Sequence, residues 1–520
     1  MIKKTLVTSI VIVFLALLAL PLRSYSVPST YNIQKYGAIG DSSVLNTKFI
    51  QSAIDDCAKA GGGTVYFPAG KYISGTLFLK SNITLFLEAG AVLIGSGTLN
   101  DYPVTVSGIR SFTDNYTDKS LIYGEGLEHI GIIGDGIMDG NGTSFKGEYK
   151  VRPYMIRIIN CKDVLVRDIT LINSPMWVQH YMACENVIID GVNVDCRRDF
   201  VNNDGIDIDG CKNVRISNCD FKSGDDGVVL KSTLNQPCEN ITVTNCIISS
   251  NCNGFKLGTE TNGGFENITF SNSVIYDTKL GGISLELVDG GKLDRVTVTN
   301  ISMNNVGTAI FIRLGNRARP FNEKMEKPGI GKLSNVMISN IQASNVGNIG
   351  CSITGLPGFP VKNISLNHIR LSFQGGGTKE FVNREIPELP EKYPEFRMFG
   401  MLPAYGFYCR HAENVTFNDV EVGFIEPEAR PAMVCDDITG LEFYRIKATP
   451  GSNQPLLQFN DVRNVFLQSN IAPEGTETFL KVTGTKSKHI VLSGNDLSGA
   501  KNTVSKDAGI DVYIDSKQLK

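Results

Sequence analysis

The chain has 520 residues, and its 53 acidic and 50 basic side chains give a formal net charge of −3. Because Lys and Arg are spread along the chain rather than gathered into blocks, nucleic acid is not expected as a partner. Hydrophobic residues make up 42%, enough for a large core, while 53 Gly and 20 Pro interrupt the chain too often for a coiled coil, a helical bundle or a disordered chain.

Residues 1–26 have the pattern of a secretory signal peptide. Two lysines precede an apolar run over residues 6–20, and Ser24-Tyr25-Ser26 follows in a small-x-small arrangement. A membrane anchor is the alternative interpretation, although the run is short for a span. We therefore expect residues 27–520 to form one exported domain, secreted or periplasmic, with no membrane contact once the signal peptide is removed.

The segment from Asn46 to Ala60 has the only strong helical pattern. Its apolar residues Phe49, Ile50, Ala53, Ile54 and Cys57 fall on one face. Asn46 stands where a cap is expected, and three glycines after Ala60 end the pattern. The pattern predicts a short helix that plugs one end of a larger structure.

Short β-runs repeat along the rest of the chain. Each has an apolar anchor after a turn residue, and most anchors are spaced by about 27 residues: Val164, Val187, Val214, Ile241, Ile268, Val296, Val336, Ile364, Val415, Leu441, Val465 and Ile490. A fixed period of this length indicates a solenoid, and several five-residue β-runs per repeat favour a parallel β-helix. Propeller blades need about 40 residues or more each, so the period is too short for a propeller.

Two residue types also recur at fixed offsets from the anchors. Cysteines precede four anchors by three residues, and asparagines follow five anchors by four: Cys161, Cys184, Cys211, Cys238; Asn218, Asn245, Asn272, Asn300, Asn340. We interpret the cysteines as small buried side chains rather than a metal or redox site. The sequence has no C-x-x-C pair and its five His are scattered, so we expect no metal and no other cofactor.

Successive repeats align on x-Gly-apolar-x-apolar-x, which places Ile206, Val228, Phe255 and Ile283 in the core and the alternate residues outside. The charged residues near these strands form one patch: Asp204, Asp207, Asp209, Asp225, Asp226, Lys231, Lys256, Glu286 and Arg313. Asp225 and Asp226 are adjacent, and Asp204 should lie one rung away. Three carboxylates this close, in a cleft open to water, should not all ionise, which suits acid/base cleavage of a glycosidic bond.

These motifs resemble glycoside hydrolase family 28, the polygalacturonases. Asn203-Asp204-Gly205 and, 21 residues after Asp204, Gly224-Asp225-Asp226 are similar to its Asn-Thr-Asp and Gly-Asp-Asp motifs. The resemblance implies an all-β chain folded as a single right-handed parallel β-helix, and inverting hydrolysis of a uronate-containing pectic substrate without metal. It also implies that Asp225 is the general acid and that Asp204 and Asp226 hold and deprotonate the water.

The sequence departs from the family pattern at two motifs. Asn253 stands in place of the His of the family's Gly-His-Gly motif, and Ser284-Leu285-Glu286 stands in place of its Arg-Ile-Lys motif, so neither cation of that motif is present. Because those family cations are understood to hold a galacturonate carboxylate, their loss argues against plain polygalacturonan. Lys256 and Arg313 are candidates for the missing charge. Asn253, Glu286, Lys231 and His180 are further candidates for substrate binding.

Two weaker features lie near the patch. Trp177, the only Trp, stands close to His180 and has either a sugar-stacking or a structural role. Residues 378–408 lengthen one repeat to 51 residues, which predicts either one wall of a binding groove or a covering loop.

Two other functions remain open for this architecture. A polysaccharide lyase would need a Lys or Arg base and usually Ca²⁺, which three carboxylates could coordinate. A non-catalytic glycan-binding solenoid would not need the acids at all.

Overall fold

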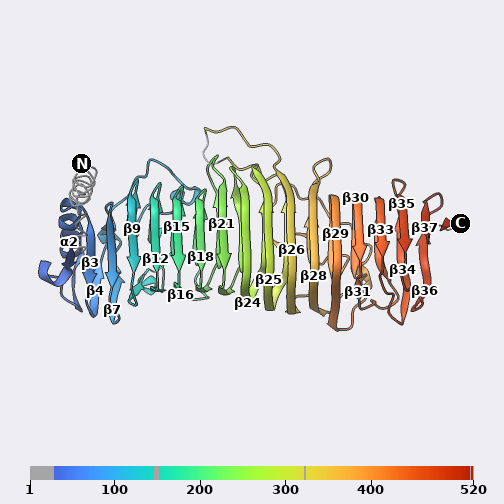
Figure 1. Cartoon of the computed structure of the whole chain (residues 1–520), viewed down its shortest axis with the longest axis horizontal. Coiled ribbons are helices and arrows are strands. Elements are labelled where there is room, and N and C mark those ends of the chain that lie inside the picture. The colour runs from blue at the N-terminus through green and yellow to red at the C-terminus, as the bar shows by residue number, and fades with distance from the viewer. Residues whose placement is uncertain (1–28, 146–150, 321–323, 516, 519–520) are drawn as a thin grey trace, which may run out of the picture.

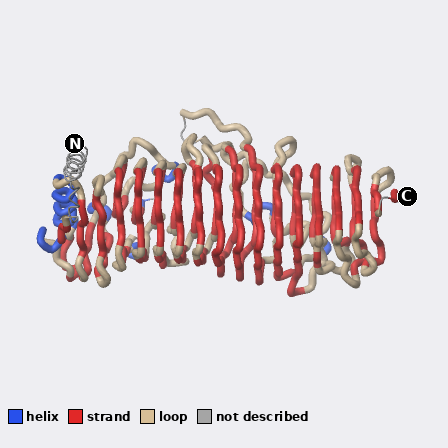
Figure 2. The backbone as a smooth tube through the Cα atoms, in the orientation of Figure 1, coloured by secondary structure: helices blue, strands red, loops and turns tan. Residues whose placement is uncertain are grey.

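The computed structural model describes residues 29–145, 151–320, 324–515 and 517–518. The predicted signal peptide lies outside the described residues. The described chain coils into a single right-handed parallel β-helix, as predicted. The helix α2 (Thr47–Lys59) lies at one end of this elongated solenoid and the C-terminus at the other (Figures 1 and 2). None of the described helices has the length and apolar character to cross a membrane.

The rungs stack their strands into three parallel faces, A, B and C. Face A contains β5 (Leu77–Phe78), β8 (Ser120–Glu125), β11 (Tyr154–Ile159), β14 (Gln179–Met182), β17 (Ile206–Asp209), β20 (Val228–Ser232), β23 (Phe255–Thr261), β27 (Cys351–Thr354), β32 (Pro455–Asn460), β34 (Thr476–Thr483) and β36 (Ala500–Lys506). Face B contains β1 (Thr30–Asn32), β3 (Gly63–Phe67), β6 (Ile83–Leu87), β9 (Glu128–Ile133), β12 (Lys162–Arg167), β15 (Glu185–Asp190), β18 (Lys212–Ser217), β21 (Cys238–Thr244), β33 (Arg463–Gln468), β35 (Lys488–Ser493) and β37 (Val512–Ile514). Face C contains β2 (Asp41–Leu45), β4 (Gly70–Ser74), β7 (Ala91–Gly95), β10 (Ile137–Asp139), β13 (Thr170–Ile172), β16 (Asn193–Asp195), β19 (Asp220–Ser223), β22 (Ile247–Ser250) and β31 (Lys447–Ala448).

In the C-terminal half, long bent strands serve more than one face: β24 (Phe265–Leu287), β25 (Lys292–Leu314), β26 (Lys332–Val346), β28 (Val361–Gly375), β29 (Phe407–Glu426) and β30 (Met433–Tyr444). The short strand β38 (Lys517–Gln518) pairs antiparallel with β37. Short 3₁₀ turns occur mostly in the connecting loops: Ile33–Tyr36, Leu99–Asp101, Phe112–Asn115, Gly142–Ser144, Lys379–Phe381 and Phe396–Phe399.

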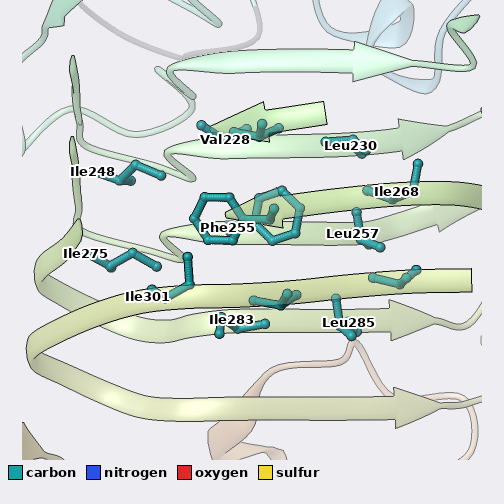
Figure 3. Close-up of a cluster of buried hydrophobic side chains, with 14 of the residues drawn as sticks. Val228, Leu230, Ile248, Phe255, Leu257, Ile268, Ile275, Ile283, Leu285 and Ile301 are labelled. Carbon is teal, nitrogen blue, oxygen red and sulfur yellow. The ribbon is translucent and has the colours of Figure 1, made fainter. Parts of the chain in front are cut away.

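The predicted anchors stack in register on face B. Val164 pairs with Val187, Val187 with Val214, and the series continues rung by rung to Ile490. On face A, Ile206, Val228, Phe255 and Ile283 pair in the same way and are fully buried, as Figure 3 shows for the last three. The strand register predicted from the repeat is therefore confirmed. Side chains at the alternate positions of each strand point away from the core.

The predicted cysteine and asparagine columns are present. The four cysteines of the column are buried free thiols. The asparagine amides form a side-chain ladder, in which Nδ2 of Asn245 donates to Oδ1 of Asn218 at 3.3 Å and Nδ2 of Asn340 donates to Asn300 at 3.0 Å. All the column asparagines have a left-handed backbone with φ between 51° and 57°, a conformation that Asn tolerates well at a turn.

The capping helix α2 forms where the pattern predicts it, but Asn46 does not cap it with its side chain. Ile50, Ala53, Ile54 and Cys57 are buried against the first rung. The Asn46 side chain instead accepts from the amide of Ile39 at 2.8 Å and donates to the same residue's carbonyl at 3.0 Å. The Asn46 side chain thus fixes the loop before the helix, and the prediction that it caps the helix is wrong.

Candidate active site

The three predicted acids lie on face A of adjacent rungs. Asp204 lies two residues before β17, and Asp226, with Asp225 next to it, lies two residues before β20. The amide of Gly205 donates to the carbonyl of Asp226 at 2.9 Å. A Cβ at Gly205 would lie 2.5 Å from the carbonyl oxygen of Gly227, so only glycine permits this close stacking of the two Asp-Gly turns. A carboxylate oxygen from each of Asp225 and Asp226 lies within 4.8 Å of the other and of Sγ of Cys252.

Asp226 is held in its ionised form. Nζ of Lys256 lies 3.0 Å from its Oδ2, and the amide of Asn253 donates to its Oδ1 at 2.8 Å from Nδ2 and 3.0 Å from the backbone. Although burial opposes ionisation, Lys256, with Lys231 and Asn253, holds the pKa of Asp226 below its usual value.

Asp225 has the opposite tendency. It is half-buried, and its oxygens accept from the backbone amides of Asn202 at 3.1 Å and Asp226 at 2.9 Å. Burial and the adjacent charge of Asp226 raise the pKa of Asp225. Neighbouring acids with opposite shifts are the arrangement that acid/base catalysis needs.

Asp204 is also driven toward its protonated form. It is 3% exposed, and its Oδ1 is buried without a hydrogen-bond partner. Burial and the charges of Asp207 and Asp225 raise its pKa well above the usual value. The resemblance gave Asp204 and Asp226 the same role, but their surroundings differ in charge.

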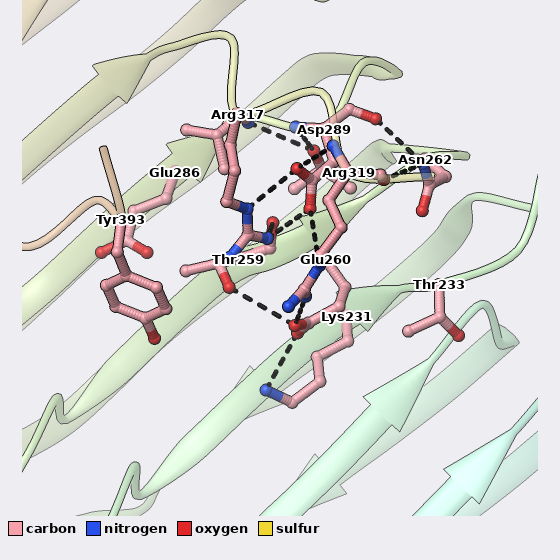
Figure 4. A network of polar contacts seen from close by, with 12 residues as sticks. Lys231, Thr233, Thr259, Glu260, Asn262, Glu286, Asp289, Arg317, Arg319 and Tyr393 are labelled. Atoms are coloured by element: carbon pink, nitrogen blue, oxygen red, sulfur yellow. Dashed lines mark hydrogen bonds and ion pairs between the residues drawn. The ribbon is translucent and has the colours of Figure 1, made fainter. Parts of the chain in front are cut away.

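A second layer of charge lies beside these acids. Nζ of Lys231 lies 3.4 Å from Glu260 and 3.7 Å from Asp207, and Arg319 forms an ion pair with Glu260 (Figure 4). Although burial favours the neutral amine, the carboxylates of Glu260 and Asp207 raise the pKa of Lys231 above its usual value. Lys231 therefore stays charged, and its ammonium compensates the carboxyl groups of Glu260 and Asp207.

Glu286 lies next to the site, on the side of Lys256. Its Oε2 lies 3.8 Å from Nζ of Lys256, yet both carboxyl oxygens are buried without a hydrogen-bond partner. Burial raises the pKa of Glu286 to about 8, despite the nearby ammonium. A carboxyl group thus occupies the position where the family pattern has a cation.

His180 and Trp177 form the packed edge of this layer. His180 is fully buried between Trp177 and Tyr154, with its Nε2 3.6 Å from Asp209, and burial lowers its pKa. Trp177 is 4% exposed, and Nζ of Lys231 lies 4.8 Å from its ring centroid. His180 packs beside Asp209, and Trp177 packs beside Lys231. Contact of His180 with substrate stays a prediction.

Arg313 is buried at the contact between face A and the insertion over residues 378–408. Its guanidinium donates to the carbonyls of Gly355 at 3.1 Å and Glu388 at 2.6 Å. The insertion packs on Phe311 through an apolar cluster that includes Phe396 and Phe399. Arg313 thus fixes the insertion, while its expected contact with substrate stays a prediction.

The insertion also brings Tyr393 to the site. Nζ of Lys256 donates to its hydroxyl at 3.3 Å, and the guanidinium of Arg317 lies 5.7 Å from its ring (Figure 4). Tyr393 is 53% exposed, which makes it an accessible aromatic ring beside the acids. Of the two interpretations of the insertion, the structure favours the wall of a binding site.

The expectation that the charged patch is open to water is wrong for most of its members. Asp207 and Asp209 are fully buried, and Asp226, Lys256 and Arg313 are each 3% exposed or less. The insertion contacts this face, because Lys256 donates to Tyr393 and Arg313 to the carbonyl of Glu388. Asp225 is the most accessible of the three candidate acids. The pattern gave the outward direction correctly but carried no information on the covering loops.

Four residues of the site were missed by sequence reasoning: Glu260, Arg317, Tyr393 and Cys252. Tyr393 and Arg317 stand in connections with no periodic pattern, so no offset marked them. Glu260 and Cys252 adjoin the aligned strand positions 253–258, and extending the alignment by a few residues would have found both.

The family model for glycosyl hydrolases family 28 matches residues 86–388, more than half of the chain. A chain with this β-helix and these acidic motifs therefore belongs to glycosyl hydrolases family 28.

Individual proteins agree with this assignment. The chain is 37% identical over 213 residues to a probable polygalacturonase of Vitis vinifera, a match that covers 38% of this chain and 43% of that protein. It is 28% identical over 263 residues to an exo-poly-alpha-D-galacturonosidase of Dickeya chrysanthemi, covering 41% and 43%. The chain thus spans less than half the length of these two relatives. Its fold is similar to the exopolygalacturonase of Thermotoga maritima, with a TM-score of 0.58, 25% identity and coverage of 67% of this chain and 88% of that one.

Proposed function

We propose that this protein hydrolyses glycosidic bonds in a uronate-containing pectic polysaccharide or oligosaccharide, by acid/base catalysis with inversion and without a metal. The observation that carries the proposal is the opposite shift of two adjacent acids, with the pKa of Asp226 lowered and that of Asp225 raised. The polygalacturonase relatives support a pectic substrate.

The residues divide the reaction between them. Asp225, protonated, donates its proton to the glycosidic oxygen as the bond to the anomeric carbon breaks. Asp226, ionised, takes a proton from the water whose oxygen forms the new bond on the opposite side of the sugar ring. Inversion is proposed from the family resemblance, because the oxygens of Asp225 and Asp226 lie within 4.8 Å of each other, closer than the separation of about 6.5–9.5 Å that is usual for an inverting pair. Asp204, which has a free carboxyl oxygen, holds that water. Exchange of one proton with solvent restores both acids.

The two alternative functions fit the site less well. A lyase needs a neutral Lys or Arg base, but carboxylate partners raise the pKa values of both Lys231 and Lys256 and keep them charged. The cluster nearest to a cation site contains a thiol and an acid already paired with Lys256, whereas Ca²⁺ prefers oxygen ligands. A protein that only binds glycans would not need the pKa values of Asp225 and Asp226 to be shifted in opposite directions.

The signal-peptide pattern of residues 1–26 supports export, which we also propose, to a secreted or periplasmic location. A β-helix of this kind over residues 27–520 would then meet its polysaccharide outside the cytoplasm.

The test is digestion of pectic oligosaccharides, with the anomer of the first product read by proton NMR. We expect the inverted anomer, activity that survives EDTA, and a loss of 10²-fold to 10⁴-fold in kcat for Asp225→Asn. A retained anomer would overturn the mechanism, and an unsaturated product that needs Ca²⁺ would establish the lyase. If the wild-type protein shows no turnover, and Asp225→Asn binds glycan as well as the wild type does, the protein is a non-catalytic glycan-binding protein.

A further inference from the structure

A hollow of about 440 Å³ lies at the corner between faces B and C, on the C-terminal rungs of β28, β29, β30 and β33 (Figure 1). Its lining includes Asn367, Asn418, Tyr444, Arg445 and Gln468. The candidate acids lie on face A of rungs nearer the N-terminus, so this hollow is separate from the candidate active site. Its volume falls in the range of small-ligand pockets.

Arg445 stands where the corner of other rungs holds asparagine. It follows the anchor Leu441 by four residues, which is the offset of the asparagine column. Its backbone is left-handed, with φ 52°, a conformation that Asn adopts more readily than a long side chain does. Backbone preference therefore does not account for an arginine at this corner, which leaves its side chain as the reason.

The guanidinium of Arg445 is exposed and forms no ion pair with any residue that the structure describes. Asp419, the corner residue of the preceding rung, lies close enough to feel its charge. The carboxylate of Asp419, however, pairs with Arg370 at 3.0 Å. Arg445 thus differs from Lys231 and Lys256 at the candidate active site, whose charges the protein's own acids neutralise.

The residue before it, Tyr444, brings an aromatic ring to the same hollow. It belongs to an outward column in which Asn367, Asn418, Tyr444 and Gln468 pair rung by rung. The Tyr444 ring is half-buried, and an edge-on contact with Phe466, at 6.0 Å between ring centroids, holds its orientation. The side-chain amides of Asn418 and Gln468 stand on the two rungs that flank the ring.

These groups together match a sugar unit that carries a carboxylate. An aromatic ring packs against the apolar face of a sugar, side-chain amides exchange hydrogen bonds with its hydroxyls, and a guanidinium pairs with a carboxylate. A neutral sugar would make no use of the charge of Arg445, and a small inorganic anion would make no use of the Tyr444 ring. A uronate uses both.

The surface for such a ligand continues around the corner onto face C. Lys447, two residues after Arg445, lines a second hollow of about 770 Å³. Lys447 is exposed and forms no ion pair within the described part of the chain, while its rung neighbour Glu421 pairs with Arg370 at 3.3 Å. A chain of uronates that leaves the first hollow at Arg445 therefore meets a second exposed cation.

We propose that the corner formed by Tyr444, Arg445 and Lys447 is a second glycan-binding site, which holds a uronate-bearing segment without cleaving it. The ligand class follows from the aromatic ring and the two exposed cations, and not from the candidate acids. The use of this site, to keep a polymer on the protein while the acids act elsewhere along it, rests on the proposed function.

The test uses Asp225→Asn, so that the probe is not cleaved, and reads amide hydrogen exchange, which reports on the corner separately from the candidate acids. The probe is a galacturonate oligosaccharide, and a neutral galactan oligosaccharide of the same length is the comparison. At a probe concentration of about ten times the Kd of the site, we expect exchange of the amides covered within residues 441–449 to slow about tenfold with galacturonate only. Arg445→Gln or Tyr444→Ala, added to Asp225→Asn, should remove most of this slowing.

Two matched controls make the same substitutions at exposed strand positions outside the hollow. Arg215→Gln on β18 and Tyr276→Ala on β24 should leave the slowing unchanged. Slowing that is absent, that neutral galactan produces equally, or that either corner variant retains in full would overturn this inference while leaving the proposed hydrolase intact. Slowing in a folded protein whose wild type cleaves no pectic oligosaccharide would instead overturn the proposed function alone.

Discussion

Nζ of Lys256 lies 3.0 Å from Oδ2 of Asp226, and this single ion pair sets the charge of the site. It holds one acid ionised beside a second acid, Asp225, whose pKa burial and the charge of Asp226 raise. The family motif alone gives Asp204 and Asp226 the same role. Their different partners are what distinguish them, because only Asp226 is paired with Lys256.

Replacing Lys256 should move the acid limb of the pH–rate profile. In Lys256→Met the carboxylate of Asp226 loses its main cation, so its pKa rises and the base becomes protonated at a higher pH. We expect the acid limb of kcat to shift upward by about one to three pH units. Lys256→Arg retains the charge and should keep the limb near its original position. An unmoved limb in Lys256→Met would show that Asp226 is not the ionised base.

Asn253 presents a donor to Asp226 and an acceptor to its other neighbours. Its Nδ2 donates to Asp226 at 2.8 Å, while its Oδ1 accepts from the amide of Gly281 at 3.0 Å and the hydroxyl of Ser284 at 2.9 Å. Asn253→Asp keeps the acceptor and replaces the donor with a second carboxyl group. Because a charge-assisted hydrogen bond contributes about 1.5–3 kcal/mol, we expect kcat to fall about 10-fold to 100-fold.

Ser284→Ala is the matched control, since it removes only a bond on the acceptor side of Asn253. Its kcat should change much less than that of Asn253→Asp. Equal losses in the two variants would mean that Asn253 acts by holding the backbone rather than by stabilising ionised Asp226.

Burial of Glu286 should make the protein less stable as the pH rises. Its pKa is about 8 in the folded chain and about 4.5 when unfolded, so between these values the folded state binds the additional proton. The free energy of unfolding therefore falls with rising pH across this window and levels off above it. Relative to Glu286→Gln, the wild-type protein should lose on the order of 3–5 kcal/mol between pH 4.5 and 8.

Denaturant midpoints of the two proteins, measured at intervals of one pH unit, provide the comparison. A difference between wild type and Glu286→Gln that stays constant with pH would show that Glu286 is ionised in the folded protein.

The sequence was sufficient for the rung register because a solenoid stacks equivalent positions. Val164 pairs with Val187 and Phe255 with Ile283, so the spacing of anchors is itself a list of contacts. The three acids followed from the same alignment. Periodicity failed where the chain leaves the rungs: Tyr393 contacts Lys256 across 137 residues, from an insertion that has no equivalent in other repeats.

The burial of the charged patch was unpredictable for a related reason. Strand alternation gives the side of the sheet on which Asp207 and Lys231 lie, but not what covers that side. Glu260, at the end of β23, pairs with Lys231, and Arg319 pairs with Glu260 from the connection after β25, whose path depends on tertiary packing. Alternation along a strand therefore shows which side chains point into the core. It does not show whether a side chain on the other side is exposed to solvent or covered by another segment.

Arg313 should control how firmly the insertion is held. Its guanidinium is 1% exposed and donates to the carbonyls of Gly355 and Glu388, so Arg313→Met leaves buried acceptors without a donor. We expect amide hydrogen exchange within residues 378–408 to accelerate about tenfold or more, with KM raised because Tyr393 belongs to this segment. Arg397→Met is the control within the same insertion, because Arg397 is half-exposed, forms its ion pair with Glu395 at 2.8 Å and lies 5.8 Å from the ring centroid of Phe396. If exchange in Arg313→Met matches that of Arg397→Met, the apolar cluster on Phe311 holds the insertion without help from the guanidinium, and Arg313 becomes available again as a candidate for substrate binding.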